Sequence, residues 1–205
     1  MITSFVVVHP EPAARSSFER RFQSAAGFRF VAATFPGIPP VDCFVTAGNS
    51  FGIMTAGIDD AVVRHFGAAI MERVQSTIVD RFRGEQPVGT AFVLDTGDAD
   101  IPCLVHAPTM RVPGSIVGTD KVYAATFAAL VAAEQHRARP IGSIAFPALG
   151  TGYGQMSFDE AARQMAVAWE HFQQPPAAIG RNWDWVRARH RRLAFDGDAQ
   201  VLSGT

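Results

Sequence analysis

The chain has 205 residues, enough for one domain with a substantial core, and 48% of them are hydrophobic, which argues against wholesale disorder. Its 18 lysines and arginines nearly balance its 19 aspartates and glutamates, so the net charge of −1 argues against a dedicated polyanion-binding protein.

Short β-branched or apolar runs that predict strands alternate with amphipathic or alanine-rich stretches that predict helices. In chain order we expect a strand at 2–9, a helix at 11–24, a strand at 28–33, a Pro/Gly turn at 34–40, a strand at 41–47, helices at 58–66 and 70–82, strands at 88–94 and 102–107, a helix at 122–136, a strand at 141–147, a helix at 157–172, a Pro-containing break at 173–180 and a helix at 183–195. Ser157, followed three residues later by Glu160, predicts a capping box. This alternation predicts an α/β sandwich around a mostly parallel sheet.

The cysteines and the apolar runs bear on the protein's environment. Cys43 and Cys103 sit in separate apolar runs without paired spacing, so we expect buried thiols rather than a disulfide or a metal site. Residues 1–8 are too short, and lack the basic flank, for a signal peptide, and no apolar run approaches membrane-spanning length. We therefore expect a soluble, cytoplasmic protein without a membrane partner.

Two glycine-bearing loops carry most of the functional information. Residues 46–59 read TAGNSFGIMTAGID and residues 146–154 read FPALGTGYG, and each loop lies between a predicted strand and a predicted helix. Glycines allow close backbone approach, and helix N-termini offer unpaired N–H groups and a positive dipole end. In open α/β sheets ligands bind at the carboxyl ends of the strands, so the two loops together predict a phosphate cradle there.

The sequence motifs of other nucleotide-binding sites and of metal sites match this chain poorly. Residues 150–154 space their glycines one residue short of a dinucleotide fingerprint and lie late in the chain, and no Gly-Lys-Ser/Thr of a P-loop exists. The six histidines show no metal-binding spacing, and His106, in an apolar strand, is interpreted as a core residue. We therefore expect no metal and no cofactor.

The two loops together resemble those of macro domains. Asn49 falls on the second asparagine of the family's Asn-Ala-Ala-Asn stretch, and Asp59, preceded by Ile58, falls on the aspartate of the hydrolytic subfamily. The second loop is similar to the family's Pro-Ala-(Ile/Leu)-Ser-Thr-Gly phosphate loop, with Gly150 in place of serine. The sequence of the first loop, together with residues 107–113, APTMRVP, resembles the divergent phage-tail-like branch of the family.

The resemblance implies a three-layer α/β/α sandwich around a mixed, mostly parallel sheet, with ADP-ribose as the ligand. It implies a macro-like domain at 1–180, followed by a basic helix at 181–196 packed on it and a flexible tail at 197–205. The implied catalytic residues are Asn49 and Asp59. The implied ligand-binding residues are Asn49, Ser50, Gly52, Ile53, Met54, Ala56, Gly57, Ile58, Leu149, Gly150, Thr151, Gly152, Tyr153 and Gly154.

Roles follow from the same resemblance. Backbone N–H groups of Ile58 and of residues 150–153 would hold the pyrophosphate, and the Asn49 carboxamide would contact a ribose diol. Asp59, in ionised form favoured by the helix dipole, would activate a water at the distal anomeric carbon. For Tyr153, stacking on the distal ribose and surface packing are equally weighted interpretations.

The chain departs from the family's pattern at several positions. Thr46 replaces the first asparagine, and residues 55–57 replace a triple glycine. The aspartate that often reads the adenine amino group has no counterpart in residues 34–40; Asp42 is the nearest acid, and Phe35 is a candidate for stacking on the base.

The favoured interpretation is a protein that binds ADP-ribose or an ADP-ribosylated macromolecule and hydrolyses the ADP-ribosyl linkage. A reader module without turnover and a phage-tail-associated structural protein with a vestigial site remain alternatives. Nucleic-acid binding through the arginine cluster at 181–192 and its tryptophans is a further alternative, but a solvated helix face is the favoured interpretation.

Overall fold

The computed structural model describes residues 1–194, within which the chain forms one six-stranded sheet of order β2-β1-β6-β3-β5-β4. All neighbouring strands are parallel except β4 and β5, which are antiparallel. The strands are β1 (Ser4–Val8), β2 (Phe28–Val31), β3 (Cys43–Thr46), β4 (Phe92–Asp95), β5 (Cys103–His106) and β6 (Ser143–Pro147). The predicted mixed, mostly parallel sheet is confirmed.

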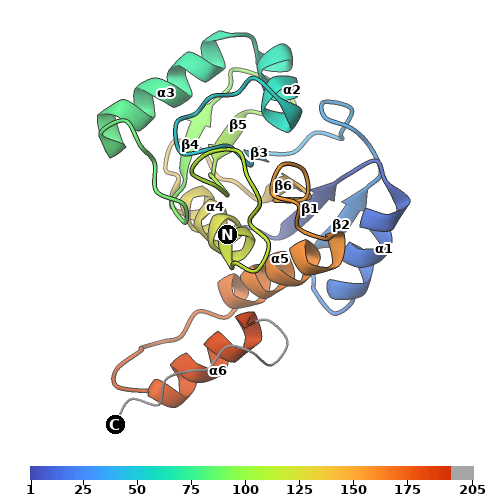
Figure 1. Cartoon of the computed structure of the whole chain (residues 1–205), viewed down its shortest axis with the longest axis vertical. Helices are drawn as coiled ribbons and strands as arrows, with labels where there is room; N and C mark the ends of the chain where they lie inside the picture. The colour runs from blue at the N-terminus through green and yellow to red at the C-terminus, as the bar shows by residue number, and fades with distance from the viewer. Residues whose placement is uncertain (195–205) are drawn as a thin grey trace.

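Six helices in the described residues cover or flank this sheet (Figure 1). They are α1 (Pro12–Arg21), α2 (Gly57–Phe66), α3 (Ala69–Phe82), α4 (Lys121–Gln135), α5 (Phe158–Gln173) and α6 (Trp183–Leu193). Side chains of α1, α4 and α5 share one buried cluster and those of α2 and α3 share another, so the three predicted layers are present.

Alternation along the strands explains the two clusters. Phe5 and Val7 of β1 belong to the α1/α4/α5 cluster, whereas Val6 and Val8 belong to the α2/α3 cluster, because successive side chains point to opposite faces. Phe5 stacks on Phe146 of β6, with ring centroids 4.6 Å apart. A central strand covered on both faces is apolar throughout, which is why the strands were recognisable from the sequence.

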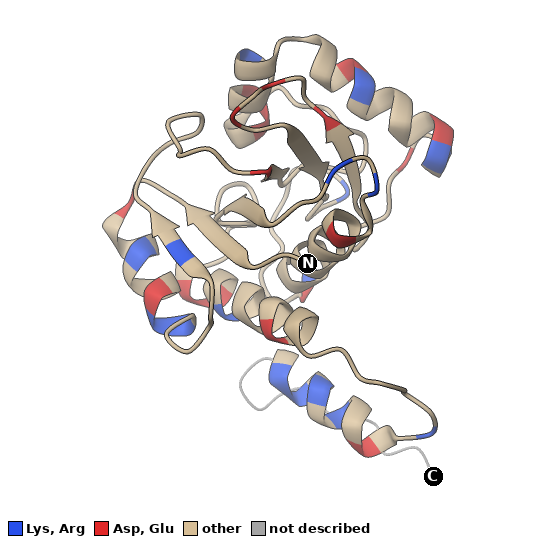
Figure 2. Cartoon of the chain, turned by 180° about the vertical axis from the view of Figure 1, so that it is seen from behind, with Lys and Arg blue, Asp and Glu red and all other residues tan. Residues whose placement is uncertain are grey.

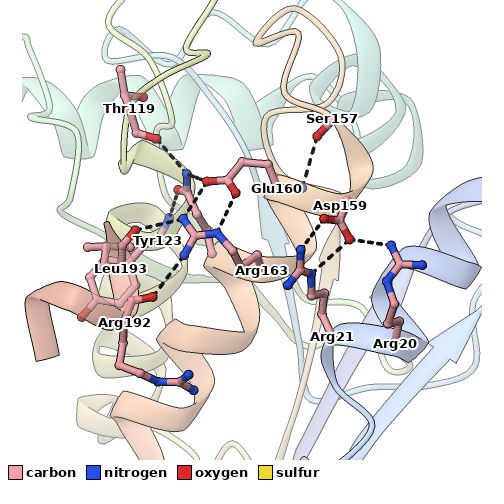
Figure 3. A network of polar contacts seen from close by, with 11 residues as sticks. Arg20, Arg21, Thr119, Tyr123, Ser157, Asp159, Glu160, Arg163, Arg192 and Leu193 are labelled. Carbon is pink, nitrogen blue, oxygen red and sulfur yellow. Dashed lines mark hydrogen bonds and ion pairs between the residues drawn. The ribbon is translucent and has the colours of Figure 1, made fainter. Parts of the chain in front are cut away.

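Polar contacts of α5 connect it to the neighbouring helices (Figure 3). Asp159 accepts hydrogen bonds from Arg20 and Arg21 of α1, which lower the pKa of its carboxyl to about 2. At the start of α5 the Ser157 hydroxyl accepts from the Glu160 amide, as predicted. The Glu160 carboxylate, however, accepts from Arg163 and Gln164 further along α5. The helix is capped, and its N3 carboxylate is used for contacts along the helix.

The basic helix α6 lies beside α5, with arginines along its length (Figures 1 and 2). It contains no buried residue, Trp183 is 66% exposed, and Arg189 donates to the backbone oxygen of His171 on α5. The predicted end of this helix at 195–196 and the predicted tail at 197–205 lie outside the described residues. In residues 1–194 no helix combines the length and apolar character needed to cross a bilayer.

Most predicted elements are longer than the observed ones. The largest difference is at 88–94, where pairing with β5 begins only at Phe92. The preceding Thr90 instead closes a turn, because both its amide and its hydroxyl donate to the Pro87 oxygen. Cys43 and Cys103 are both buried free thiols, as expected, and burial raises the pKa of each.

Candidate functional site

A pocket of about 820 Å³ lies where the parallel strands end. Its walls come from residues that end or follow β1, β2, β3, β5 and β6, and from the first residues of α2 and α5. This is the edge at which ligands bind in open α/β sheets. In the sheet order, β2 and β5 are separated by four strand spacings, so the pocket spans roughly 19 Å of the sheet edge.

Both glycine-bearing loops contribute to this one pocket. The predicted site residues that line it are Asn49, Ile53, Ala56, Gly57, Ile58, Asp59, Gly150, Thr151, Gly152, Tyr153 and Gly154. Four others do not line it: Ser50, Gly52, Met54 and Leu149. The Met54 and Leu149 side chains are buried in the core, with 1% and 0% exposure.

Ser50 and Gly52 stabilise the first loop on the side away from the pocket. The Ser50 amide donates to the Met110 oxygen, and the Ser50 oxygen accepts from the Gln86 amide. Gly52 has a φ of +64°, and a Cβ there would lie 2.8 Å from a methyl group of Val74 on α3. These residues shape the pocket wall without facing it.

The N-terminus of α2 opens into the pocket. No side chain caps the helix, whose Ncap residue is Ala56, and Asp60 is the first residue whose amide donates to the Ncap oxygen. The amides of Gly57, Ile58 and Asp59 therefore have no acceptor within residues 1–194, and all three residues line the pocket. Such a helix end is suited to an anion.

The second loop supplies a further set of amides. The Thr151, Gln155 and Met156 amides donate to oxygens within the loop. The amides of residues 152–154 find no acceptor in the part of the chain that the structure describes. Gly150 has a φ of +76°, and a Cβ there would lie 2.7 Å from Val122, so this turn requires glycine. The two loops thus present unpaired N–H groups to one pocket.

The Asn49 carboxamide is used within its own loop. Its Nδ2 donates to the Ile53 oxygen at 2.8 Å, and its Oδ1 accepts from the Phe51 and Ile53 amides at 3.1 and 3.3 Å. Asn49 is 9% exposed and lines the pocket. The contacts that the structure shows are those of a turn-forming asparagine.

Asp59 is almost fully enclosed, with 8% exposure. Burial raises the pKa of its carboxyl from 3.8 to about 6, and a hydrogen bond donated by the Thr46 hydroxyl lowers it in part. The position of Asp59 at a helix N-terminus predicted an ionised carboxylate, which the helix dipole favours. Desolvation acts in the opposite direction, and it outweighs the hydrogen bond from Thr46. Thr46, which stands in place of the first asparagine of the macro-domain pattern, therefore orients the Asp59 carboxylate.

The opposite end of the pocket contains residues that the sequence argument missed. His9, Glu11 and Phe158 line this end, and the His9 ring meets the Phe158 ring edge-on with centroids 4.9 Å apart. Phe35 lines the pocket but is only 7% exposed. The signal for Glu11 was its place in the short connection between β1 and α1, at the edge where ligands bind.

Asp42 lies away from this pocket, at the other edge of the sheet. Its Oδ2 accepts from the amides of Gly142 and Ser143 at 2.9 and 2.8 Å and from the Ser143 hydroxyl. It connects the starts of β3 and β6 and is not a base-reading acid.

The segment after β5 forms a further wall. Thr109, Met110, Val112 and Pro113 line the pocket, and Met110 pairs with Asn49 in an isolated parallel bridge. From the sequence, residues 107–113 were identified only by their resemblance to one branch of a family and not as part of the site, because nothing local predicts that β5 lies beside β3. This adjacency brings the segment to the first loop.

His106 is a core residue, as predicted, and lies beneath the first loop. Its Nδ1 is 2.6 Å from the Gln86 Oε1, and its buried Nε2 has no hydrogen-bond partner within residues 1–194. Burial lowers the pKa of the ring to about 3. A Cβ on Gly48 would lie 2.1 Å from Nε2, so this part of the pocket wall requires glycine. No cluster of three or more histidine, cysteine or acidic side chains suited to a metal exists in the described residues.

Comparison with known proteins agrees with this geometry. The sequence model of the Macro domain family matches residues 45–165. An uncharacterized protein of Aeropyrum pernix is 32% identical over 144 residues, which are 69% of this chain and 71% of that protein. A macro domain-containing protein of Streptomyces nogalater, encoded in the sno 5′ region, is 28% identical over 67% of this chain and 73% of its own length.

Two solved structures illustrate the likeness of fold. The macrodomain of Thermus aquaticus DarG matches with a TM-score of 0.58 and 24% identity, over 69% of this chain and 89% of that one. Thermosipho africanus DarTG in complex with ADP-ribose matches with a TM-score of 0.53 and 17% identity, over 66% of this chain and 36% of that one. The family match and the shared fold lead to one conclusion: this chain belongs to the macro domain family.

Proposed function

We propose that this chain binds ADP-ribose, or an ADP-ribosylated macromolecule, in the pocket at the strand ends and hydrolyses the ADP-ribosyl linkage. The observation that carries the proposal is the meeting of two sets of unpaired amides, from the α2 N-terminus and from residues 152–154, in a pocket that also contains a buried carboxylate. Amides and a helix dipole recognise a diphosphate, and the carboxylate acts on the sugar beyond it.

The sheet order favours one direction of binding. The β2 and β1 end of the pocket presents Glu11 and the Phe158 ring, which suit the amino group and the face of an adenine. The pyrophosphate lies between the two loops, and the distal ribose lies at the β3 and β5 end near Asp59. A ligand with a base, two sugars and a diphosphate in line suits the extended shape of the pocket.

The charges in the pocket fit this arrangement. None of the described residues that line it is a lysine or arginine, so amides rather than side-chain cations hold the phosphates. Asp59 lines the same pocket and, when ionised, is repelled by a diphosphate, while its burial raises its pKa to about 6. A general base is most effective when its pKa lies near the working pH.

The chemistry then requires one water. The Asp59 carboxylate accepts a proton from this water while the water oxygen attacks the distal anomeric carbon. The bond from that carbon to the acceptor breaks through an oxocarbenium-like transition state, and the acceptor leaves with the bonding electron pair and takes up a proton from solvent. Thr46 is a positioning residue, because its hydroxyl donates to the carboxylate and fixes its direction.

One observation favours the reader alternative. The Asn49 carboxamide, expected to contact the ribose, has both its oxygen and its nitrogen engaged with the loop. A site in which this amide serves only to shape the loop would bind ADP-ribose without orienting the sugar for attack.

Calorimetry with ADP-ribose, followed by incubation with an ADP-ribosylated protein, tests the proposal. We expect binding, release of ADP-ribose, and at least about a hundredfold slower release by Asp59→Asn with binding retained. The matched control is Asp60→Asn, which neutralises the next residue, a half-buried partner of Arg64 that does not line the pocket. Binding without release supports the reader, and absence of binding by folded protein refutes the proposal.

A further inference from the structure

The end of the pocket near Asp59 is bordered by exposed apolar side chains from three loops. Ile53, Val112 and Tyr153 all line the pocket and are 52%, 54% and 61% exposed. Large apolar side chains so exposed, and gathered around a pocket, indicate a contact surface. We call these three residues the apolar rim.

Hydrogen bonds and a backbone bridge hold the three loops of the apolar rim together. Asn49 binds the Ile53 oxygen and forms a bridge with Met110, two residues before Val112. The Ile116 amide donates to the Gly154 oxygen at 2.9 Å, which ties the segment after Val112 to the loop of Tyr153. The rim is therefore part of the folded framework at the β3 and β5 end of the pocket.

This end of the pocket also lacks positive charge. Residues 46–58, 112–119 and 147–158 contain no charged side chain. Arg111 is the neighbouring cation, but its guanidinium donates to both carboxylate oxygens of Glu85, at 2.6 and 2.9 Å, and lies over the Phe51 ring. The charged group that does line this end is the Asp59 carboxylate.

We propose that the apolar rim selects ADP-ribosyl derivatives whose anomeric substituent is uncharged and apolar, and rejects those that carry a phosphate there. This inference rests on the proposed function and names the class of acceptor that the site takes. A phosphate monoester carries one to two negative charges at neutral pH. Next to an ionised carboxylate, and with the loop amides occupied by the diphosphate, it loses hydration without a cation to pair with. An apolar substituent instead covers the rim and gains from burial.

The test compares three ligands by calorimetry with the full chain at pH 7.5: ADP-ribose, ADP-ribose phosphorylated on the anomeric oxygen, and its O-benzyl glycoside. We expect the benzyl glycoside to bind at least as tightly as ADP-ribose and the phosphate to bind at least tenfold more weakly. A phosphate that binds as tightly as ADP-ribose overturns this inference alone. Failure of all three ligands to bind overturns the proposed function together with it.

A charge introduced into the rim gives a second measurement. Val112→Lys adds a cation at an exposed position and is expected to raise affinity for the phosphate severalfold relative to ADP-ribose. The matched control is Val79→Lys on α3, because Val79 is 60% exposed and does not line the pocket. Equal effects of the two substitutions contradict the inference, as does phosphate binding in the wild type that is lost in Arg111→Gln.

Discussion

Neutralising the buried Asp59 carboxylate is expected to stabilise the protein at alkaline pH. The group is almost fully enclosed, and its burial raises its pKa from 3.8 to about 6. The folded state therefore binds this proton more tightly than the unfolded state does. The associated stability is fully present below pH 3.8 and is lost as the pH rises through 6.

The shift sets the size of the effect. A difference of about two pKa units at about 1.4 kcal/mol each means that the ionised carboxylate lowers the free energy of unfolding by about 3 kcal/mol at pH 8. At pH 4 the same linkage amounts to less than about 1 kcal/mol. Asp59→Asn removes the charge, keeps the side chain's shape, and leaves an oxygen to accept from the Thr46 hydroxyl.

Urea unfolding at pH 4 and pH 8 measures this difference. We expect Asp59→Asn to be more stable than the wild type by about 2–3 kcal/mol at pH 8, with most of the gain absent at pH 4. Asp60→Asn serves as the control: it removes a partly exposed ion pair with Arg64 worth at most about 1 kcal/mol, and loss of this pair should not stabilise the chain. A gain for Asp59→Asn that is the same at both pH values would refute the argument from burial.

Three further predictions use the same structure. Thr46→Val removes the hydroxyl that lowers the pKa of Asp59, so the acidic limb of the pH–rate profile for ADP-ribosyl release should move to higher pH; an unmoved limb contradicts the positioning role. Gly48→Ala places a Cβ 2.1 Å from the His106 Nε2 and should lower the free energy of unfolding, measured in urea, by about 1–3 kcal/mol. The double variant with His106→Ala should lose less stability than the two single variants together, and strict additivity would argue against the clash. Asp159→Asn should lower the free energy of unfolding by at most about 1 kcal/mol at pH 7, because this carboxylate pairs with two α1 arginines near the surface. Its folded pKa of about 2 lies below the ordinary 3.8, so this contribution to stability is lost as the pH falls through 2. A difference between variant and wild type that persists unchanged below pH 2 would speak against the linkage.

Several site residues could be predicted because their signals are local. Gly57 and Gly150 were recognisable from loops that follow apolar runs and precede helices, and parallel strands bring such loops to one edge. Glu11 and Val112 were missed, because an acid after a strand or a valine in a loop looks alike whether it faces solvent or a pocket. The turn-forming contacts of Asn49 required the folded loop to be seen.

The alternation of apolar periods in this sequence determined the α/β class, the order of the elements and the two loops with their glycines, because each of these depends on residues close together in the chain. The tertiary structure decided that β6 lies between β1 and β3, which brings the second loop beside the first. It also decided the burial of Asp59 and its contact with Thr46. Desolvation and hydrogen-bond partners depend on groups that folding brings together from distant parts of the chain, and no local pattern records them.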